Sequence, residues 1–138
     1  MDIEYKINTD VTVEQFRDLL RQSTLAERRP VDDLECLAGM LRHSNLIVSA
    51  WIDGALVGIA RSVTDFTYCC YLSDLAVSEA HQRRSIGIEL QRLTQAQLGP
   101  RCKLILIAAP AADEYYHKIG FTKNERCWVL QRDEQVAG

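Results

Sequence analysis

The pattern of apolar and polar positions in the first third of the chain predicts one short strand and two helices. Apolar residues alternate with polar ones over positions 3–7, which is typical of a half-buried strand. Apolar residues then recur with helical spacing after two pairs that resemble capping boxes, Thr12 with Gln15 and Asp32 with Glu35. The polar stretch Ser23–Pro30, with its two arginines, predicts a loop between the two helices.

The middle of the chain changes to a pattern of consecutive strands. Asp53-Gly54 is a strong signal for a tight hairpin turn between two apolar runs. A third run, rich in aromatic and apolar residues, follows the turn region around Asp65. The predicted strands of this meander are Leu46–Ile52, Leu56–Thr64 and Tyr68–Val77.

The last third predicts alternating helices and strands. Gly99-Pro100 ends a helix, and the almost wholly apolar segment after it indicates a buried parallel strand. The predicted elements are a helix over Ile86–Leu98, a strand over Lys103–Ala109, a short helix over Ala112–Ile119 and a last strand over Cys127–Gln131. The order βααβββαβαβ predicts an α/β fold, with a mixed, mostly antiparallel sheet and helices on both faces.

Composition narrows the class of protein. A chain of 138 residues is the size of one domain, so we expect a single domain over residues 1–138. Sixteen basic and nineteen acidic residues give a net charge of −3, which argues against a general nucleic-acid binder. No apolar run approaches the ~20 residues of a membrane helix, and the first ten residues contain no apolar signal core. We therefore expect a cytoplasmic protein with no membrane partner.

Cysteine and histidine spacing gives no indication of a metal site or a disulfide framework. The five cysteines are odd in number and form no CxxC pair, and the three histidines show no HxH or HxxxH spacing. We expect reduced, mostly buried thiols and no bound metal.

The segment Leu75–Leu90 contains the strongest candidate site. A strand ends at Val77, and the sequence Gln82–Gly87 (QRRSIG) then opens a helix. Small residues at Ser85 and Gly87 would let a ligand approach the backbone, and the free N–H groups of the first helical turn favour an anion. The segment therefore predicts a pyrophosphate site, or alternatively an ordinary helix start with surface arginines.

A second segment, Ala112–Phe121, places two neighbouring tyrosines on a short helix. A tyrosine hydroxyl can donate a proton to a leaving group. Tyr115 and Tyr116 are therefore candidates for a proton donor, and the alternative is that both rings pack within the fold.

Together the two segments resemble the GCN5-related N-acetyltransferases, the GNAT superfamily. The family's Q/R-x-x-G-x-G/A loop matches Gln82–Gly87. Its A-x-x-aromatic-Tyr-x-x-x-Gly-Phe element matches Ala112, Tyr115, Tyr116, Gly120 and Phe121. The separation of the motifs by one helix and one strand also agrees, and the resemblance covers essentially the whole chain.

The resemblance implies acetyl-CoA as co-substrate and a primary amine as acceptor, which would attack the thioester directly. The backbone of Leu75, Ala76 and Val77 would align the pantetheine as an added strand. Tyr116 matches the tyrosine that protonates the departing thiolate in many members. The positions that would hold the pyrophosphate are Gln82, Arg83, Arg84, Ser85, Ile86, Gly87 and Ile88.

Two positions depart from the family pattern. Ser85 replaces the usual first glycine of the loop, so its backbone must adopt a conformation that serine tolerates. The stretch Ala108–Pro110 lacks the asparagine that many members carry before the tyrosine helix, so one contact to CoA or to the reaction is expected to be missing.

A weaker resemblance connects the chain to the branch that includes plant and cyanobacterial serotonin N-acetyltransferases. In that branch an Asp precedes the three apolar residues of the strand that binds CoA, and Asp74 matches it. A carboxylate there can accept the proton of an attacking amine, and the alternative is a carboxylate tied to a helix N-terminus or an arginine. Asp65 is a candidate for binding a cationic amine, or for turn chemistry. Arg28 and Arg29 are predicted to flank the acceptor entrance, unless they are only solvated surface residues.

Two function classes follow. The first is an N-acetyltransferase, an acyltransferase that acts on a small amine, an amino acid derivative or a peptide, and the resemblance also allows a homodimer. The second is a GNAT-like module that binds acyl-CoA without turning it over. A P-loop nucleotide-binding protein is disfavoured because there is no GxxxxGK[ST] motif.

Overall fold

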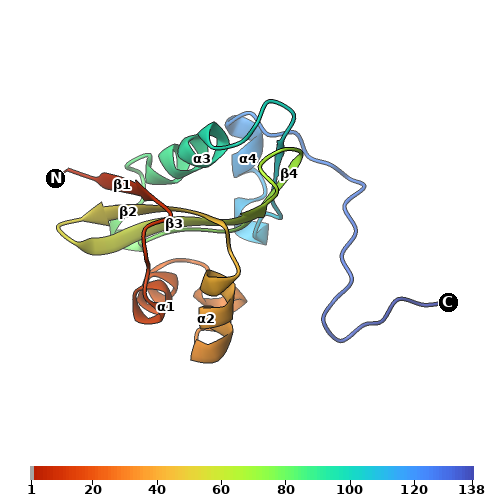
Figure 1. Cartoon of the computed structure of the whole chain (residues 1–138), viewed down its shortest axis with the longest axis horizontal. Coiled ribbons are helices and arrows are strands. Elements are labelled where there is room, and N and C mark those ends of the chain that lie inside the picture. Colours follow the sequence, from red (N-terminus) through yellow and green to blue (C-terminus); the bar gives the residue numbers. More distant parts are fainter. Residues whose placement is uncertain (1) are drawn as a thin grey trace. The chain divides into compact units, whose positions relative to one another are not determined.

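The computed structural model describes residues 2–138 and divides them into two compact units, one ending at Ile107 and one running from Ala108 to Gly138. The first unit is a five-stranded sheet in the order β1-β2-β3-β4-β5, with helices on both faces (Figure 1). Its strands are β1 (Glu4–Ile7), β2 (Leu46–Ile52), β3 (Ala55–Thr64), β4 (Cys69–Val77) and β5 (Lys103–Ile105). Its α-helices are α1 (Val13–Gln22), α2 (Leu34–Arg42) and α3 (Ile86–Ala96). Of its two short 3-10 helices, η1 (Ala26–Arg28) lies between α1 and α2, and η2 (Glu79–His81) lies between β4 and α3.

The sheet is antiparallel except for its last pair. β1, β2, β3 and β4 pair antiparallel in turn, and β5 runs parallel to β4. The hairpin between β2 and β3 turns at Asp53 and Gly54, whose φ angles of 48° and 80° are those of the tight turn that the sequence predicts. The predicted mixed, mostly antiparallel sheet is confirmed.

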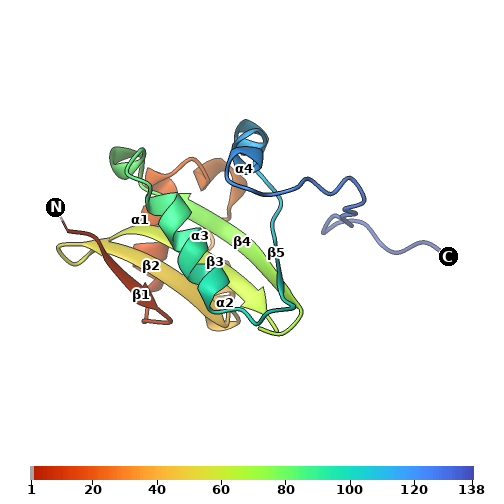
Figure 2. The same ribbon diagram turned by 90° about the horizontal axis from the view of Figure 1, so that it is seen from above.

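Two apolar layers fill the space between helices and sheet. α1 and α2 bury Phe16, Leu19 and Leu37 against one face. α3 lies along the other face and buries Ile86 and Leu90 (Figure 2). Helices on both faces of the sheet were expected from the element order, and both layers are present.

The N-cap of α1 is the residue that the sequence predicts, whereas the N-cap of α2 lies one residue later than predicted. Thr12 and Gln15 form the predicted capping box of α1, with side chain and backbone bonded in both directions. The second predicted box, Asp32 with Glu35, is wrong. Asp33 is the N-cap of α2 and accepts from the backbone N–H of Cys36, while Asp32 forms an exposed ion pair with Arg21.

Two predicted strands differ in the structure. The strand expected over Lys103–Ala109 is limited to β5 and is an edge strand, so Ile105 is 47% exposed and not buried. The last strand expected over Cys127–Gln131 is absent from the structure of residues 2–138, and Trp128 is 92% exposed. Alternation of side chains alone does not make a strand, because a strand also needs a hydrogen-bonding partner along its edge.

The second unit contains a 3-10 helix, η3 (Pro110–Ala112), and a short helix, α4 (Tyr115–Lys118), in place of the continuous helix expected over Ala112–Ile119. Gly120 ends α4 with a φ of 104°, and the N–H of Phe121 donates to the carbonyl of Tyr116 at 3.0 Å. These are the features of a Schellman C-cap, as the glycine predicts. The two tyrosines of α4, Gly120 and Phe121 are therefore held together by the C-cap of one short helix.

The cysteines are free but not mostly buried. Cys70 is buried, which raises the pKa of its thiol, and Cys102 is half-buried. Cys36, Cys69 and Cys127 are exposed, so that part of the prediction is wrong. Among residues 2–138 no three or more His, Cys, Asp or Glu side chains gather as metal ligands would. No helix in this described range has the length and apolar character needed to cross a membrane.

Candidate acyl-CoA site

The end of β4 presents an unpaired backbone edge. β5 pairs with β4 only from Cys69 to Tyr71, whereas β4 continues to Val77. On its other side β4 stays paired with β3, from Thr64↔Cys70 to Gly58↔Val77. Residues 72–77 of β4 therefore have a neighbouring strand on one side alone within the first unit.

The register of β3 and β4 shows which amides face this open edge. The N–H of Ser78 donates to the carbonyl of Val57 at 2.9 Å, so residue 78 points its backbone groups towards β3. Backbone groups alternate along an antiparallel pair, so Ala76 also points to β3 while Leu75 and Val77 point to the open side. An extended ligand with amide groups could add to this edge as a strand would.

The loop that follows β4 leads directly into the N-terminus of α3. The first hydrogen bond of α3 runs from the N–H of Glu89 to the carbonyl of Ser85 at 3.1 Å. The N–H groups of Ile86, Gly87 and Ile88 consequently have no acceptor within the helix, and Ser85 does not cap them with its side chain. Unsatisfied N–H groups and the helix dipole together favour an anion at this position.

Two residues of the loop between β4 and α3 have a left-handed backbone conformation. Ser85 has a φ of 59° and Arg83 a φ of 68°, a region that non-glycine residues rarely occupy. Serine thus takes the conformation for which the family pattern has a glycine. Gln82, Arg83, Arg84 and Ser85 are all exposed, and Gln82 donates a side-chain hydrogen bond to the carbonyl of Val77 at 3.3 Å.

Gly87 leaves space beside the helix start. A Cβ atom added there would meet only Val77 Cγ2, at 3.8 Å, which is ordinary contact. The fold itself therefore does not require a glycine at this position. A ligand against the first turn of α3 would supply the reason for a residue without a side chain.

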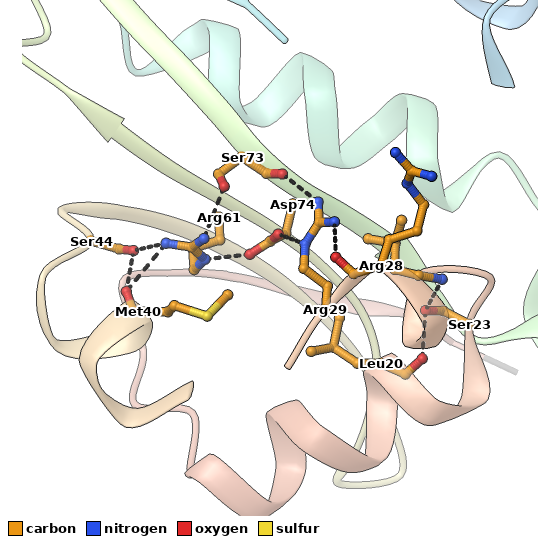
Figure 3. Close-up of polar contacts among 10 residues, drawn as sticks. Leu20, Ser23, Arg28, Arg29, Met40, Ser44, Arg61, Ser73 and Asp74 are labelled. Carbon is orange, nitrogen blue, oxygen red and sulfur yellow. Dashed lines mark hydrogen bonds and ion pairs between the residues drawn. The ribbon is translucent and has the colours of Figure 1, made fainter. Parts of the chain in front are cut away.

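Asp74 is tied to two arginines, which is the second of the two interpretations that the sequence left open. Its carboxylate is completely buried. Oδ1 accepts from Arg29 Nε at 2.5 Å, and Oδ2 accepts from Arg61 Nε (Figure 3). A carboxylate held by two guanidinium groups and closed to solvent is poorly suited to accept a proton from an amine, so the geometry favours an ion pair over a general base.

Arg29 is joined to the sheet and Arg28 is not. Besides Asp74, Arg29 donates to the carbonyls of Ser73 at 2.8 Å and Arg28 at 2.9 Å. Arg28 is exposed, and its guanidinium group points away from Asp74 in Figure 3. Of the two arginines predicted to flank an acceptor entrance, Arg28 alone has a side chain directed away from this cluster.

Asp65 shapes the turn between β3 and β4. Its Oδ1 accepts from the backbone N–H groups of Thr67, Tyr68 and Cys69 at 2.8–3.0 Å. These bonds, first that from the N–H of Cys69 and then those from Tyr68 and Thr67, lower the pKa of Asp65 to about 2. The turn precedes β4 whereas the anion site follows it, so the length of the strand, roughly 30 Å, lies between them. The structure thus shows the turn chemistry that was the alternative for Asp65, and the role in binding an amine stays a prediction.

In the second unit, Tyr116 packs among aromatic rings. Its ring centroid lies 5.0 Å from that of Tyr115 and 5.5 Å from that of Phe121, both edge to face. Burial, and secondarily the charge of Tyr115, raises the pKa of Tyr116. The hydroxyl is therefore fully protonated at neutral pH, as a proton donor must be.

The sequence analysis missed Arg61 and Ser73. Arg61 is the one charged residue of its strand, and an ionic residue inside a largely buried strand is a signal for a buried partner. Ser73 is the extra residue where the β3–β4 register changes from Arg61↔Asp74 to Ser62↔Leu72. Nothing in the alternation of side chains indicated this irregularity beforehand.

Comparison with known proteins agrees with the fold and with the family that the sequence resembles. Residues 10–138 match the model of the acetyltransferase (GNAT) domain family. The chain therefore belongs to the GNAT acetyltransferases. A search of curated proteins gives no match.

Solved structures of acetyltransferases share the fold. A GNAT-family acetyltransferase from Streptococcus pneumoniae TIGR4 superposes with a TM-score of 0.72 at 22% identity, over 94% of this chain and 99% of that one. An aminoglycoside N-acetyltransferase solved in complex with CoA gives a TM-score of 0.72 at 18% identity, over 96% and 95% of the two chains. The PaiA N-acetyltransferase from Thermoplasma acidophilum, also in complex with coenzyme A, gives 0.65 at 17% identity, over 88% and 91%.

Proposed function

We propose that the chain is an acetyl-CoA-dependent N-acetyltransferase that transfers an acetyl group to a primary amine. The observation that carries the proposal is the junction of the open β4 edge with the uncapped start of α3. An extended amide-rich arm attached to a pyrophosphate has the chemistry that these two features would recognise. The two relatives solved with CoA, although distant in sequence, support this assignment.

In this proposal the pantetheine arm bonds to the backbone of Leu75 and Val77. The pyrophosphate lies against the N–H groups of the first turn of α3, and Arg83 and Arg84 add positive charge beside it. Gly87 leaves room for the phosphate oxygens to approach the helix backbone.

The reaction itself is direct transfer. The neutral amine attacks the thioester carbonyl carbon, the C–S bond breaks, and the acetyl group forms an amide with the amine nitrogen. The proton that this nitrogen loses passes to solvent, and the group that protonates the thiolate regains its proton from solvent. We assign to Tyr116 the protonation of the departing thiolate because the segment Ala112–Phe121 matches the family's tyrosine element, and the raised pKa of Tyr116 keeps its hydroxyl in the acid form. The exposed Arg28 is our candidate for contacting the acceptor. The acceptor class remains a small amine, an amino acid derivative or a peptide.

Two measurements test the proposal. Titration calorimetry with acetyl-CoA and with pantetheine lacking the phosphates should show much tighter binding of acetyl-CoA, and equal affinities would overturn the pyrophosphate assignment. A screen of small amines, peptides and aminoglycosides for release of free CoA should then identify an acceptor. Tight acetyl-CoA binding with no release for any acceptor class would instead indicate a module that binds acyl-CoA without turnover.

A further inference from the structure

Three segments of the first unit meet at one buried carboxylate, and no step of the proposed reaction uses it. Asp74 comes from β4, Arg61 from β3 and Arg29 from the connection between α1 and α2 (Figure 3). We propose that Arg29 is a positioning residue, which fastens the α1–α2 connection to the irregular part of β4 through Asp74 and Ser73. The inference rests on the proposed function only in assigning a kinetic consequence to this attachment.

The two arginines of the cluster have different tasks. Arg61 lies directly opposite Asp74 in the register of β3 and β4, so their proximity follows from the sheet alone. Arg29 has no such register and reaches Asp74 across 45 positions of sequence. Removing Arg29 would therefore release the α1–α2 connection, whereas the sheet would remain paired.

Ser73 is held from both sides by the same cluster. Arg29 donates to the backbone carbonyl of Ser73 at 2.8 Å, and Arg61 donates to the Ser73 hydroxyl at 2.9 Å. Ser73 is also the residue at which the β3–β4 register shifts, two positions before Leu75. The arginines thus determine the geometry of the backbone that leads into the open edge of β4.

Arg61 extends the attachment to the end of α2. Its guanidinium group donates to Ser44 Oγ at 2.9 Å and to the carbonyl of Met40 at 3.3 Å, and Ser44 Oγ donates to the same carbonyl at 2.6 Å. The α1–α2 connection and the C-terminus of α2 are consequently held by one carboxylate and its two partners.

Burial makes the cluster intolerant of losing one member. The side chain of Arg61 is 8% exposed, that of Arg29 is 22% exposed and that of Asp74 is inaccessible. Removing one partner from a buried pair leaves an uncompensated charge, which costs far more than an exposed pair contributes. The exposed pair of Arg21 with Asp32, at 3.3 Å, therefore provides a matched control in the same region.

Hydrogen–deuterium exchange of the full chain tests the attachment without any substrate. In Arg29→Met and Asp74→Asn we expect amide exchange to accelerate by about tenfold or more in residues 24–33 and 72–77, because one lost contact of 1.4 kcal/mol corresponds to a factor of ten. Arg21→Met should leave both segments unchanged. Equal exchange in Arg29→Met and Arg21→Met would overturn the inference.

A second variant protects the test against loss of folding. Arg29→Lys keeps the positive charge but cannot donate to Asp74 and to the carbonyl of Ser73 in the same fixed geometry. We expect faster exchange in the same two segments, to a smaller degree than in Arg29→Met. Wild-type exchange rates in Arg29→Lys would show that charge alone, and not the positioning of Ser73, is what Arg29 supplies, which contradicts the proposal.

The kinetic consequence separates this inference from the proposed function. With acetyl-CoA and an amine identified by the CoA-release screen, Arg29→Lys should lower kcat by about 10- to 100-fold, while the acetyl-CoA affinity stays within about threefold of wild type. An unchanged kcat would overturn the kinetic part. If the wild-type chain binds no acetyl-CoA at all, the proposed function fails, and the exchange experiment still decides the role of Arg29.

Discussion

Gly58 lies directly beneath Ile86, so that a Cβ atom on this glycine would stand 3.0 Å from Ile86 Cγ2. The same added Cβ atom would stand 3.1 Å from Leu90 Cδ1. α3, whose first turn forms the candidate anion site, thus packs on β3 at a position where the strand has no side chain.

Replacing this glycine tests the packing of α3. We expect Gly58→Ala to lower the free energy of unfolding by about 1–3 kcal/mol, because an extra methyl group must displace two buried side chains. Gly39→Ala is the control, since no atom lies within 4 Å of its added Cβ and alanine favours the helix by about 0.5–1 kcal/mol. Urea unfolding measures both, and a stabilised Gly58→Ala variant would contradict this account of the contact.

Gly87 separates folding from binding. Gly87→Ala meets only ordinary contact with Val77, so we expect the free energy of unfolding to stay constant or rise slightly. Acetyl-CoA affinity should nevertheless fall, and Gly87→Glu should abolish binding because its carboxylate would occupy and repel the phosphate site. Calorimetry beside thermal unfolding checks this prediction, and wild-type affinity in Gly87→Glu would remove the site from the first turn of α3.

Ser85 occupies a left-handed conformation that glycine adopts more easily. Because the φ of Ser85 is 59°, we expect Ser85→Gly to raise the free energy of unfolding by about 0.5–1 kcal/mol. Ser78→Gly, at a φ of −53°, provides the comparison and should be destabilising, because it gains only flexibility in the unfolded chain. The same sign for both substitutions would show that the backbone conformation of Ser85 costs nothing.

Tyr116→Phe tests the proton donor. The ring would still pack against Phe121, so acetyl-CoA affinity should hardly change while kcat falls by about 10²–10⁴-fold. Tyr115→Phe should have a mild effect, because a neighbouring helical residue points roughly 100° away. The raised pKa of Tyr116 keeps the acid form present at neutral pH, so we expect deprotonation of this group to lower kcat only under alkaline conditions. A larger effect for Tyr115→Phe would transfer the role to that residue.

The lowered pKa of Asp65 predicts that this residue contributes to the free energy of unfolding in a way that depends on pH. Its pKa is lowered to about 2 in the folded chain, below the ordinary value of about 3.9, so the folded state binds its proton later than the unfolded state. The contribution is complete above about pH 4 and is lost as the pH falls towards 2. Urea unfolding of Asp65→Asn should lack this part of the pH dependence, and identical acid profiles for variant and wild type would contradict it.

Local patterns in the sequence predicted the parts of the fold that depend on neighbours in the chain. The capping box of Thr12, the turn at Asp53-Gly54 and the C-cap at Gly120 are each determined by a few adjacent residues. The ion pairs of Asp74 join residues 13 and 45 positions apart, and their identity depends on which faces of which elements meet. The strand expected at Cys127–Gln131 failed for the same reason, since alternation cannot specify a partner.

The extra residue in β4 has a consequence for how one strand serves two layers. Side chains along a strand alternate with period two, so a single inserted residue exchanges the faces to which odd and even positions point. Leu72 packs in the α3 layer, while Ala76, another even position, packs in the layer of α1 and α2. Deleting Ser73 would restore strict alternation with Leu72 and Asp74 still on opposite faces, and it would remove the Ser73 hydroxyl that Arg61 binds. The single insertion thus gives each arginine a second acceptor on β4 beside Asp74, and it leaves the layers that Leu72 and Asp74 face unchanged.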